Sequence, residues 1–280
     1  MGSMRKMPVD RDRGVRFEYL RMKPHDHMGW AFDGIREFAA VAAPYLTEGA
    51  ALGERLCYVA DDPDPADMAQ LVDLVDGDAL QISSVAEIYG DGVIDPFQQR
   101  RTYAEVLDDA LSAGYTGIRV VADASSMVIE DERLKSWIEW EIVGDRMIAE
   151  QPFTALCAFD KQRVDSGRLR HIATVHPLSS ASGPVPPFRL FSAGGTLCVE
   201  GQVDSSAITQ LWLALENLTI GTDVLVDLGS ARLMSRGVLA GLSQLCDSGV
   251  DVTIRGERGL IEELRKSVAP PHGNLVLEEA

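Results

Sequence analysis

Continuous apolar runs that alternate with amphipathic segments are the feature that most restricts how this chain can fold. The runs ERLCYVA (54–60), GIRVVADA (117–124) and TALCAF (154–159) have the length and content of strands buried on both faces. The segments between them place apolar side chains at helical spacing, as around 35–45, 96–111 and 134–149. This alternation predicts a parallel sheet covered by helices on both faces. The expected fold class is therefore α/β.

A stretch of small residues, prolines and glycine, SSASGPVPP, divides the chain at 179–187. Its composition disfavours a helix or a central strand, so we expect a linker there. Residues 17–178 are then a first α/β domain. Residues 188–280 begin with two strands and continue with alternating helices and strands, which predicts a second, smaller α/β domain. Residues 1–16 are expected to be a disordered leader, in which Met1–Ser3 look like a remnant of expression.

The net charge of the chain restricts its partners. With 26 Lys and Arg against 43 Asp and Glu, the charge is −17, so the surface repels nucleic acid and anionic lipid. No apolar run approaches the roughly 20 residues of a membrane-spanning helix, and the start of the sequence has no signal-type apolar region. The four cysteines lie far apart, as expected for buried thiols in a reducing compartment. We therefore expect a cytoplasmic protein that binds neither nucleic acid nor a membrane.

Matches scattered in fixed order through the first domain make it similar to a family of sensory domains. The matching residues are His27 with Gly29 and Trp30, EGAALGERLCYV (48–59), Tyr89, Asp95 with Pro96, GYTGIRVVAD (114–123), Trp140 with Glu141, LCAFD (156–160), His171, and His176 with Pro177. Through them, residues 17–179 resemble the MEDS, or DcmR-like, domain of methanogen and methylotroph regulators. The resemblance implies a RecA/KaiC-like core that has lost nucleotide chemistry and senses small organic compounds.

An ATPase of that topology needs the loop GxxxxGK[ST], because backbone amides and a lysine must offset phosphate charge. The resemblance places this position in HMGWAFDGI (27–35), which has glycines but no lysine and adds Asp33. The following acidic loop at 61–64 would repel phosphate. We therefore expect a core without a phosphate-binding loop.

Seven residues are candidates for binding a small ligand instead. A histidine near a tryptophan suits a pocket that is partly apolar and partly polar, although an ordinary packed or surface histidine fits the pattern as well. Arg119 and Asp123 lie on one face of a strand, near the end where α/β sheets bind ligands, or they pair and neutralise each other. The candidates are His27, Trp30, Tyr89, Arg119, Asp123, Glu141 and His176.

No metal, cofactor or catalytic residue is expected. His25–Asp26–His27 contains metal-binding residue types, but adjacent side chains point in different directions, and a second histidine would have to come from His171 or His176. The motifs GxSxG and HExxH are absent from the sequence. The alternative to a binding protein is an enzyme that acts on a small carbonyl or nucleotide substrate in the α/β crevice.

The second domain resembles the STAS fold of sulfate transporters and anti-sigma-factor antagonists over 188–280. The resemblance rests on Gly201 and Asp204 in VEGQVDSS (199–206), the helix expected after them, and VLVDLGSARLMSRGVLAGL (224–242). In such antagonists a serine or threonine at a helix start is phosphorylated, but here Arg236 stands where that residue usually lies. Ser235 is the phosphorylation candidate, with Ser230 the runner-up, because Ser235 is placed at a helix start, where a plain N-cap fits equally well.

These features together predict a non-enzymatic signalling protein. The first domain is expected to bind a small organic ligand. The STAS domain is expected to pass that state to an anti-sigma kinase-like or other STAS-interacting protein, in a partner switch that regulates transcription.

Overall fold

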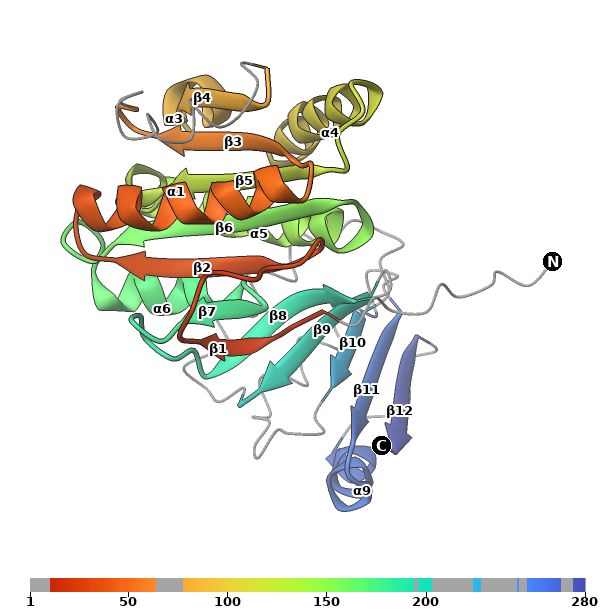
Figure 1. Cartoon of the computed structure of the whole chain (residues 1–280). Helices are drawn as coiled ribbons and strands as arrows, with labels where there is room; N and C mark the ends of the chain where they lie inside the picture. Colours follow the sequence, from red (N-terminus) through yellow and green to blue (C-terminus); the bar gives the residue numbers. More distant parts are fainter. Residues whose placement is uncertain are drawn as a thin grey trace. The chain divides into compact units, whose positions relative to one another are not determined.

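The computed structural model describes residues 11–63, 78–193, 196–202, 224–227, 246, 251–267 and 274–279. Backbone contacts divide these residues into two compact units, one that ends at Val185 and one that begins at Pro186. Each unit contains its own β-sheet, the first of seven strands and the second of five (Figure 1).

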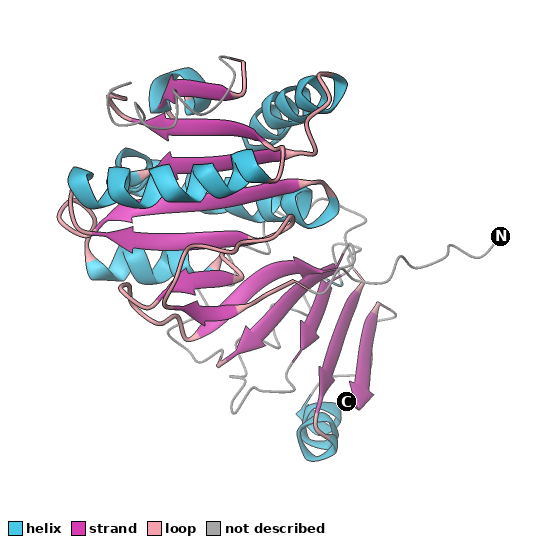
Figure 2. Cartoon of the chain, viewed as in Figure 1, coloured by secondary structure: helices cyan, strands magenta, loops and turns pink. Residues whose placement is uncertain are grey.

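The first unit is built on a sheet in which every neighbouring pair of strands is parallel. The strand order is β1-β7-β2-β6-β5-β3-β4. The strands are β1 (Gly14–Arg16), β2 (His27–Phe32), β3 (Arg55–Ala60), β4 (Leu80–Ser84), β5 (Ile118–Asp123), β6 (Phe153–Asp160) and β7 (Leu178–Ser180). All residues of β2, β5 and β6 are buried, because helices cover both faces of the sheet (Figure 2). The predicted α/β class is confirmed.

Helices connect these strands, and three of those described begin at a side-chain cap. They are α1 (Ile35–Ala51), α3 (Val85–Tyr89), α4 (Pro96–Ser112), α5 (Asp131–Glu150) and α6 (Ser166–Thr174), with the 3₁₀ helix η2 (Ser125–Val128) before α5. Asp95 caps α4, since its carboxylate accepts hydrogen bonds from the backbone N–H groups of Phe97 and Gln98. Gly114 follows α4 with a φ of 93°, a conformation that favours glycine.

Helix α1 packs on one face of the sheet and forms an apolar core with it. The ring of Phe38 in α1 packs against Phe32 of β2 and Tyr58 of β3, and Trp30 of β2 belongs to the same core. Because side chains alternate along a strand, His27 and Gly29 of β2 point to the opposite face. Figure 1 shows α5 and α6 on that opposite face, behind the sheet. The sheet therefore separates two environments, an apolar one under α1 and a mixed one under α5 and α6.

Residues 11–16 are ordered, which corrects the prediction of a disordered leader that extends to residue 16. Gly14–Arg16 form β1 and pair with β7 at the edge of the sheet. Arg11 is buried in an ion pair with Asp145 of α5. A three-residue strand without an apolar run leaves no hydrophobic pattern in the sequence, so it was not predicted.

The predicted linker at 179–187 is wrong in its first half. Ser179 and Ser180 are buried in β7, which lies between β1 and β2. The small residues allow close packing here, since a Cβ on Gly183 would lie 3.0 Å from Ala31 Cβ. A composition typical of linkers therefore serves tight packing, and the boundary between the units falls later, after Val185.

The second unit has a mixed sheet in the order β12-β11-β10-β9-β8. Its strands are β8 (Phe188–Ala193), β9 (Thr196–Gly201), β10 (Val224–Asp227), β11 (Val252–Gly256) and β12 (Leu275–Glu279), with helix α9 (Arg258–Ser267) between the last two. β8 and β9 are antiparallel, whereas the other pairs are parallel. Ile261 and Leu264 of α9 are buried. Within the described ranges, no helix of either unit has the length and apolarity needed to cross a membrane.

Candidate functional site

A group of polar side chains is buried between the first sheet and α5. Its members, His27, Glu141, Asp145, Cys157 and His176, are each at most 8% exposed and are called the buried cluster below. His27 begins β2, Cys157 lies in β6, and His176 stands between α6 and β7. Glu141 and Asp145 are one helical turn apart on α5, so they share a face of that helix.

The strand register explains why these side chains meet. Gly29 of β2 lies opposite Cys157 of β6, and His27 is two residues before Gly29, on the same face of the sheet. Gly29 leaves room for the ring of His176, since a Cβ at this position would lie 3.1 Å from that ring. The parallel pairing of β2 and β6 thus brings a histidine and a thiol to one place under α5.

His27 lies at the centre of the buried cluster. Its Nε2 atom is 3.1 Å from Oε2 of Glu141 and 3.5 Å from Sγ of Cys157. On the other side of Glu141, Oε1 is 3.5 Å from Nε2 of His176. The two imidazole rings are 4.4 Å apart between centroids. One carboxylate therefore lies between two histidines, with a thiol beside it.

The outer nitrogen of each imidazole has a partner of its own. Nδ1 of His27 lies 3.1 Å from Oδ1 of Asp145, and Nδ1 of His176 donates to the carbonyl oxygen of Ile172 at 2.8 Å. Asp145 in turn accepts two hydrogen bonds from the Arg11 guanidinium, at 2.7 and 3.1 Å. These contacts fix both rings with their Nε2 atoms directed at Glu141.

The charges of the cluster support one another. Burial lowers the pKa of both histidines and is the largest single cause at each, but it is outweighed at His27 by the hydrogen bonds with Asp145, Cys157 and Glu141 together, and at His176 by the interactions with Glu141 and Cys157 together. The pKa of His27 is therefore well above its usual range, and that of His176 is raised to about 9. Burial also raises the pKa of Glu141, yet His176 and His27 lower it to about 2. The site thus favours positive charge at both imidazoles beside an ionised carboxylate.

Trp30 and Arg119 lie on the other face of the sheet, away from the cluster. Trp30 packs edge-on against Tyr19 with ring centroids 4.7 Å apart, so the expected pocket shared by His27 and Trp30 does not form. Arg119 donates from Nε to Oε2 of Glu54 at 2.6 Å. Of the two alternatives left open for Arg119, pairing with Asp123 is wrong, because four residues along a strand separate two side chains by about 13 Å. Arg119 is also near the start of β5 rather than at the ligand-binding end.

Asp123 and Tyr89 form separate contacts. Asp123 ends β5, where its Oδ1 accepts a hydrogen bond from the backbone N–H of Ser125 at 3.0 Å, and burial raises its pKa. The Tyr89 hydroxyl lies 2.8 Å from that of Tyr103, and its ring packs against Trp137 of α5. Of the seven candidates, the structure therefore gathers His27, Glu141 and His176 into one site and leaves the other four outside it.

The sequence predictions did not include three residues of the site and its surroundings. Cys157 was interpreted only as a buried thiol, because its strand register with His27 is a long-range property. Asp145 follows Glu141 by four residues, and this helical spacing was the available signal. Arg11 was assigned to the leader.

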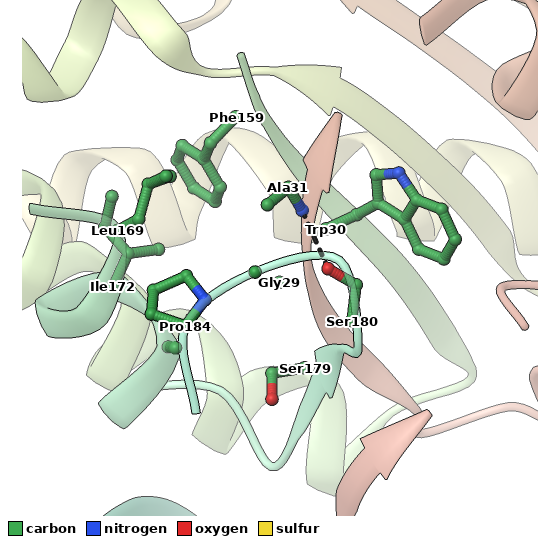
Figure 3. A pocket seen from close by; sticks show the side chains of 11 residues that line it. Gly29, Trp30, Ala31, Phe159, Leu169, Ile172, Ser179, Ser180 and Pro184 are labelled. Atoms are coloured by element: carbon green, nitrogen blue, oxygen red, sulfur yellow. Dashed lines mark hydrogen bonds between the residues drawn. The ribbon is translucent and has the colours of Figure 1, made fainter. Parts of the chain in front are cut away.

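A small apolar cavity lies beside the buried cluster (Figure 3). It has a volume of about 20 Å³, and its lining comprises Gly29, Trp30, Ala31, Phe159, Leu169, Ile172, Ala173, Ser179, Ser180, Gly183 and Pro184. Figure 3 shows the Trp30 side chain pointing away from this space, so its backbone borders the cavity. Gly29 connects the cavity to the cluster, since it touches His176 as well. Ser179 and Ser180 contribute the hydroxyl groups of the wall.

The phosphorylation candidate Ser235 and its runner-up Ser230 lie outside the described residues, as does Asp204.

The family model described as MEDS, "MEthanogen/methylotroph, DcmR Sensory domain", matches residues 26–177. This match spans β2 to the end of α6 and includes every member of the buried cluster. No curated protein matches the chain.

Proposed function

The chain belongs to the MEDS family of sensory domains, and on that premise we propose that it is a cytoplasmic sensor that binds a small organic molecule in the cavity beside His176. The observation that carries this proposal is the cavity itself. It is apolar on most of its wall, is bordered by two serine residues, and touches the buried cluster through Gly29. Such a combination of apolar surface and few polar groups suits a small, weakly polar ligand.

The size of the cavity restricts the ligand. A cavity needs roughly 10–15 Å³ to hold one water molecule, and this one measures about 20 Å³. Without rearrangement it accepts a molecule of only a few heavy atoms. Short-chain alcohols and aldehydes have that size, one polar group for a serine hydroxyl, and an apolar part for Leu169 and Ile172.

A binding role is proposed rather than a catalytic one. The imidazoles of His27 and His176 and the carboxylate of Glu141 are at most 2% exposed and contact one another. Acid and base groups that are enclosed in this way do not meet a substrate in the crevice at the carboxyl ends of the strands.

The second unit is proposed to pass the signal on by protein–protein interaction, as a STAS-like domain of the anti-sigma-factor antagonist type. Its mixed sheet, with one antiparallel pair followed by parallel strands, and its amphipathic helix α9 support this assignment. Gly183 and Pro184 line the cavity, and the second unit begins at Pro186. A ligand that shifts this segment is therefore expected to act on the start of the second unit, with an anti-sigma kinase-like protein as the partner.

Ligand binding is tested on the full chain with methanol, ethanol, 1-propanol and 1-butanol as probes. We expect the methyl NMR signals of Leu169 and Ile172 to shift saturably with the shorter alcohols, while those of Leu134, a buried leucine outside the cavity, stay unchanged. Filling the cavity by Ala173→Leu should abolish the shifts. Ala149→Leu, on α5 and outside the cavity, is the matched control. Saturable shifts that survive Ala173→Leu, or alcohols that shift no methyl signal of the wall, would contradict the proposed site.

A further inference from the structure

We propose that His27, Glu141, Cys157 and His176 together bind one transition-metal ion of the zinc class, as a closed four-ligand site. The inference rests on the convergence of these donors and not on the neighbouring cavity. It is therefore independent of the proposed ligand. The two imidazoles, the carboxylate and the thiol each present one donor atom, and these atoms all lie within 4.8 Å of one another.

The distances between donor atoms fit a tetrahedral ion. Typical Zn–N, Zn–O and Zn–S bonds place neighbouring ligand atoms about 3.3–3.6 Å apart. In the cluster, His27 Nε2 is 3.1 Å from Glu141 Oε2 and 3.5 Å from Cys157 Sγ. His176 Nε2 is 3.5 Å from Glu141 Oε1, and Cys157 Sγ is 4.0 Å from Glu141 Oε2. Since all donor atoms lie within 4.8 Å of one another, shifts on the order of an ångström or less at each donor bring the four to metal-binding geometry.

The orientation of both imidazoles is that of metal ligands. Metal-binding histidines usually donate their other ring N–H to a carboxylate or a backbone carbonyl, which fixes the tautomer. Here the acceptors are the Asp145 carboxylate for His27 and the Ile172 carbonyl for His176. With Nδ1 of each ring donating to these acceptors, each Nε2 is left to face Glu141. A metal cation at this position would displace the two Nε2 protons and take over the positive charge that they place beside the carboxylate.

The charge balance of the buried site supports a divalent ion. Two neutral imidazoles, one carboxylate and one thiolate carry two negative charges together, which a divalent cation neutralises. In the described part of the chain, the ion pairs of Glu141 are with His27 and His176, and Arg11 is engaged by Asp145. A thiolate with two imidazoles favours zinc or a similar transition metal over magnesium or calcium.

The four ligands come from four parts of the chain, namely β2, α5, β6 and the turn between α6 and β7. An ion bound by all of them fastens α5 and the α6–β7 turn to the central strands. Because protein atoms fill all four positions, the site is expected to be structural rather than hydrolytic.

Cobalt(II) is the probe for this site, because it replaces zinc in tetrahedral sites and absorbs visible light. The full chain is produced in medium supplemented with cobalt, and its metal content and absorption spectrum are measured. We expect about one ion per chain, intense d–d bands of a tetrahedral ion, and a thiolate-to-cobalt charge-transfer band in the near ultraviolet. A folded chain that retains no cobalt or zinc overturns the proposal.

Matched variants assign the bands to these residues. Cys157→Ser should remove the charge-transfer band, whereas Cys57→Ser, at a buried cysteine on β3, should retain it. His176→Gln should lose the metal, whereas His171→Gln, on α6 outside the cluster, should retain it. Asp145→Asn keeps all four ligands and should weaken metal binding by about 10–100-fold. If circular dichroism shows that one of these variants does not fold, Glu141→Gln is measured in its place. Bands that persist in folded Cys157→Ser or His176→Gln would place the ion elsewhere and overturn the proposal.

Discussion

Arg11 neutralises Asp145 inside the first unit, although the two residues lie far apart in the sequence. Both side chains are 3% exposed, and the guanidinium binds the carboxylate through two hydrogen bonds. Removing one partner of a buried ion pair leaves the other charge unpaired and costs about 3–5 kcal/mol. Arg11→Ala is therefore expected to lower the free energy of unfolding by that amount, as measured by urea denaturation.

Arg146→Ala is the matched control on the same helix as Asp145. Arg146 pairs with Glu150 across an exposed surface, with side chains 44% and 41% exposed, so its loss should cost at most about 1 kcal/mol. Equal effects of the two variants would mean that Asp145 does not depend on Arg11 for its charge compensation.

Asp123 provides a prediction about pH. Burial raises the pKa of its carboxyl above the unfolded value, so the folded protein binds this proton more tightly than the unfolded chain does. The stability linked to this group is then present below the unfolded pKa and is lost as the pH rises through the folded pKa. Asp123→Asn retains an oxygen that accepts the Ser125 N–H, and it removes the buried charge.

We therefore expect Asp123→Asn to be more stable than the wild type at pH 7, with a difference that shrinks as the pH falls toward 4. Urea denaturation at a series of pH values measures this difference. A difference that stays constant with pH would show that the charge of Asp123 is not its cause.

At the scale of elements, α1 approaches the sheet closely because Gly49 has no side chain. A Cβ at this position would lie 2.6 Å from Arg119 Cδ and 2.8 Å from Leu56 Cδ2. Arg119 cannot easily withdraw, since Glu54 holds it by a hydrogen bond of 2.6 Å. Gly49→Ala should therefore destabilise the protein by about 1–3 kcal/mol through overpacking. Gly92→Ala, where a Cβ meets no atom within 4 Å, should change the midpoint of thermal unfolding little. A similar loss of stability in both variants would contradict the explanation by overpacking.

The turn between β2 and α1 leads to a prediction about nucleotides. It has only two residues, and its backbone N–H groups already have acidic partners, since Asp33 donates to Glu37 Oε2 and Gly34 donates to Asp160 Oδ1. Carboxylates thus occupy the place at the helix start where a nucleotide phosphate would bind. Calorimetric titration of the full chain with Mg-ATP should show no binding at micromolar concentrations. Saturable heat with one site per chain would contradict this and favour the enzyme alternative.

The success of the sequence predictions depended on whether the signal was local. Helix α4 and the apolar strands β5 and β6 are each encoded by residues within one segment, and they were predicted. The candidate site was found only in part. His27, Glu141 and His176 were chosen by residue type, whereas Cys157 joins them through strand pairing, which no local pattern reveals. The short strands β1 and β7 lack an apolar run, so both domain boundaries of the first unit were placed too far inward.

At the scale of the whole molecule, all strand pairs described lie within one of the two sheets. Each sheet therefore has its own hydrogen-bonding pattern and its own buried side chains, as expected for independent folding units. The fragment 1–185 contains β1, β7 and the whole cavity wall, and it should unfold cooperatively in urea. The fragment 186–280 should give the circular dichroism spectrum of a folded α/β protein.

A shorter fragment tests where the first unit begins and ends. The fragment 17–178 follows the boundaries predicted from the sequence and contains every apolar strand of the first unit. It lacks β1, most of β7, Arg11, and the cavity-wall residues Ser179, Ser180, Gly183 and Pro184. Without Arg11, Asp145 keeps a buried charge that lacks its guanidinium partner, and β2 loses its neighbour at the edge of the sheet. We expect this fragment to be less stable than 1–185 by at least the cost of Arg11→Ala, about 3–5 kcal/mol. Urea denaturation followed by circular dichroism measures both fragments. Equal stabilities would show that residues 11–16 and 179–185 pack on a first unit that is complete without them.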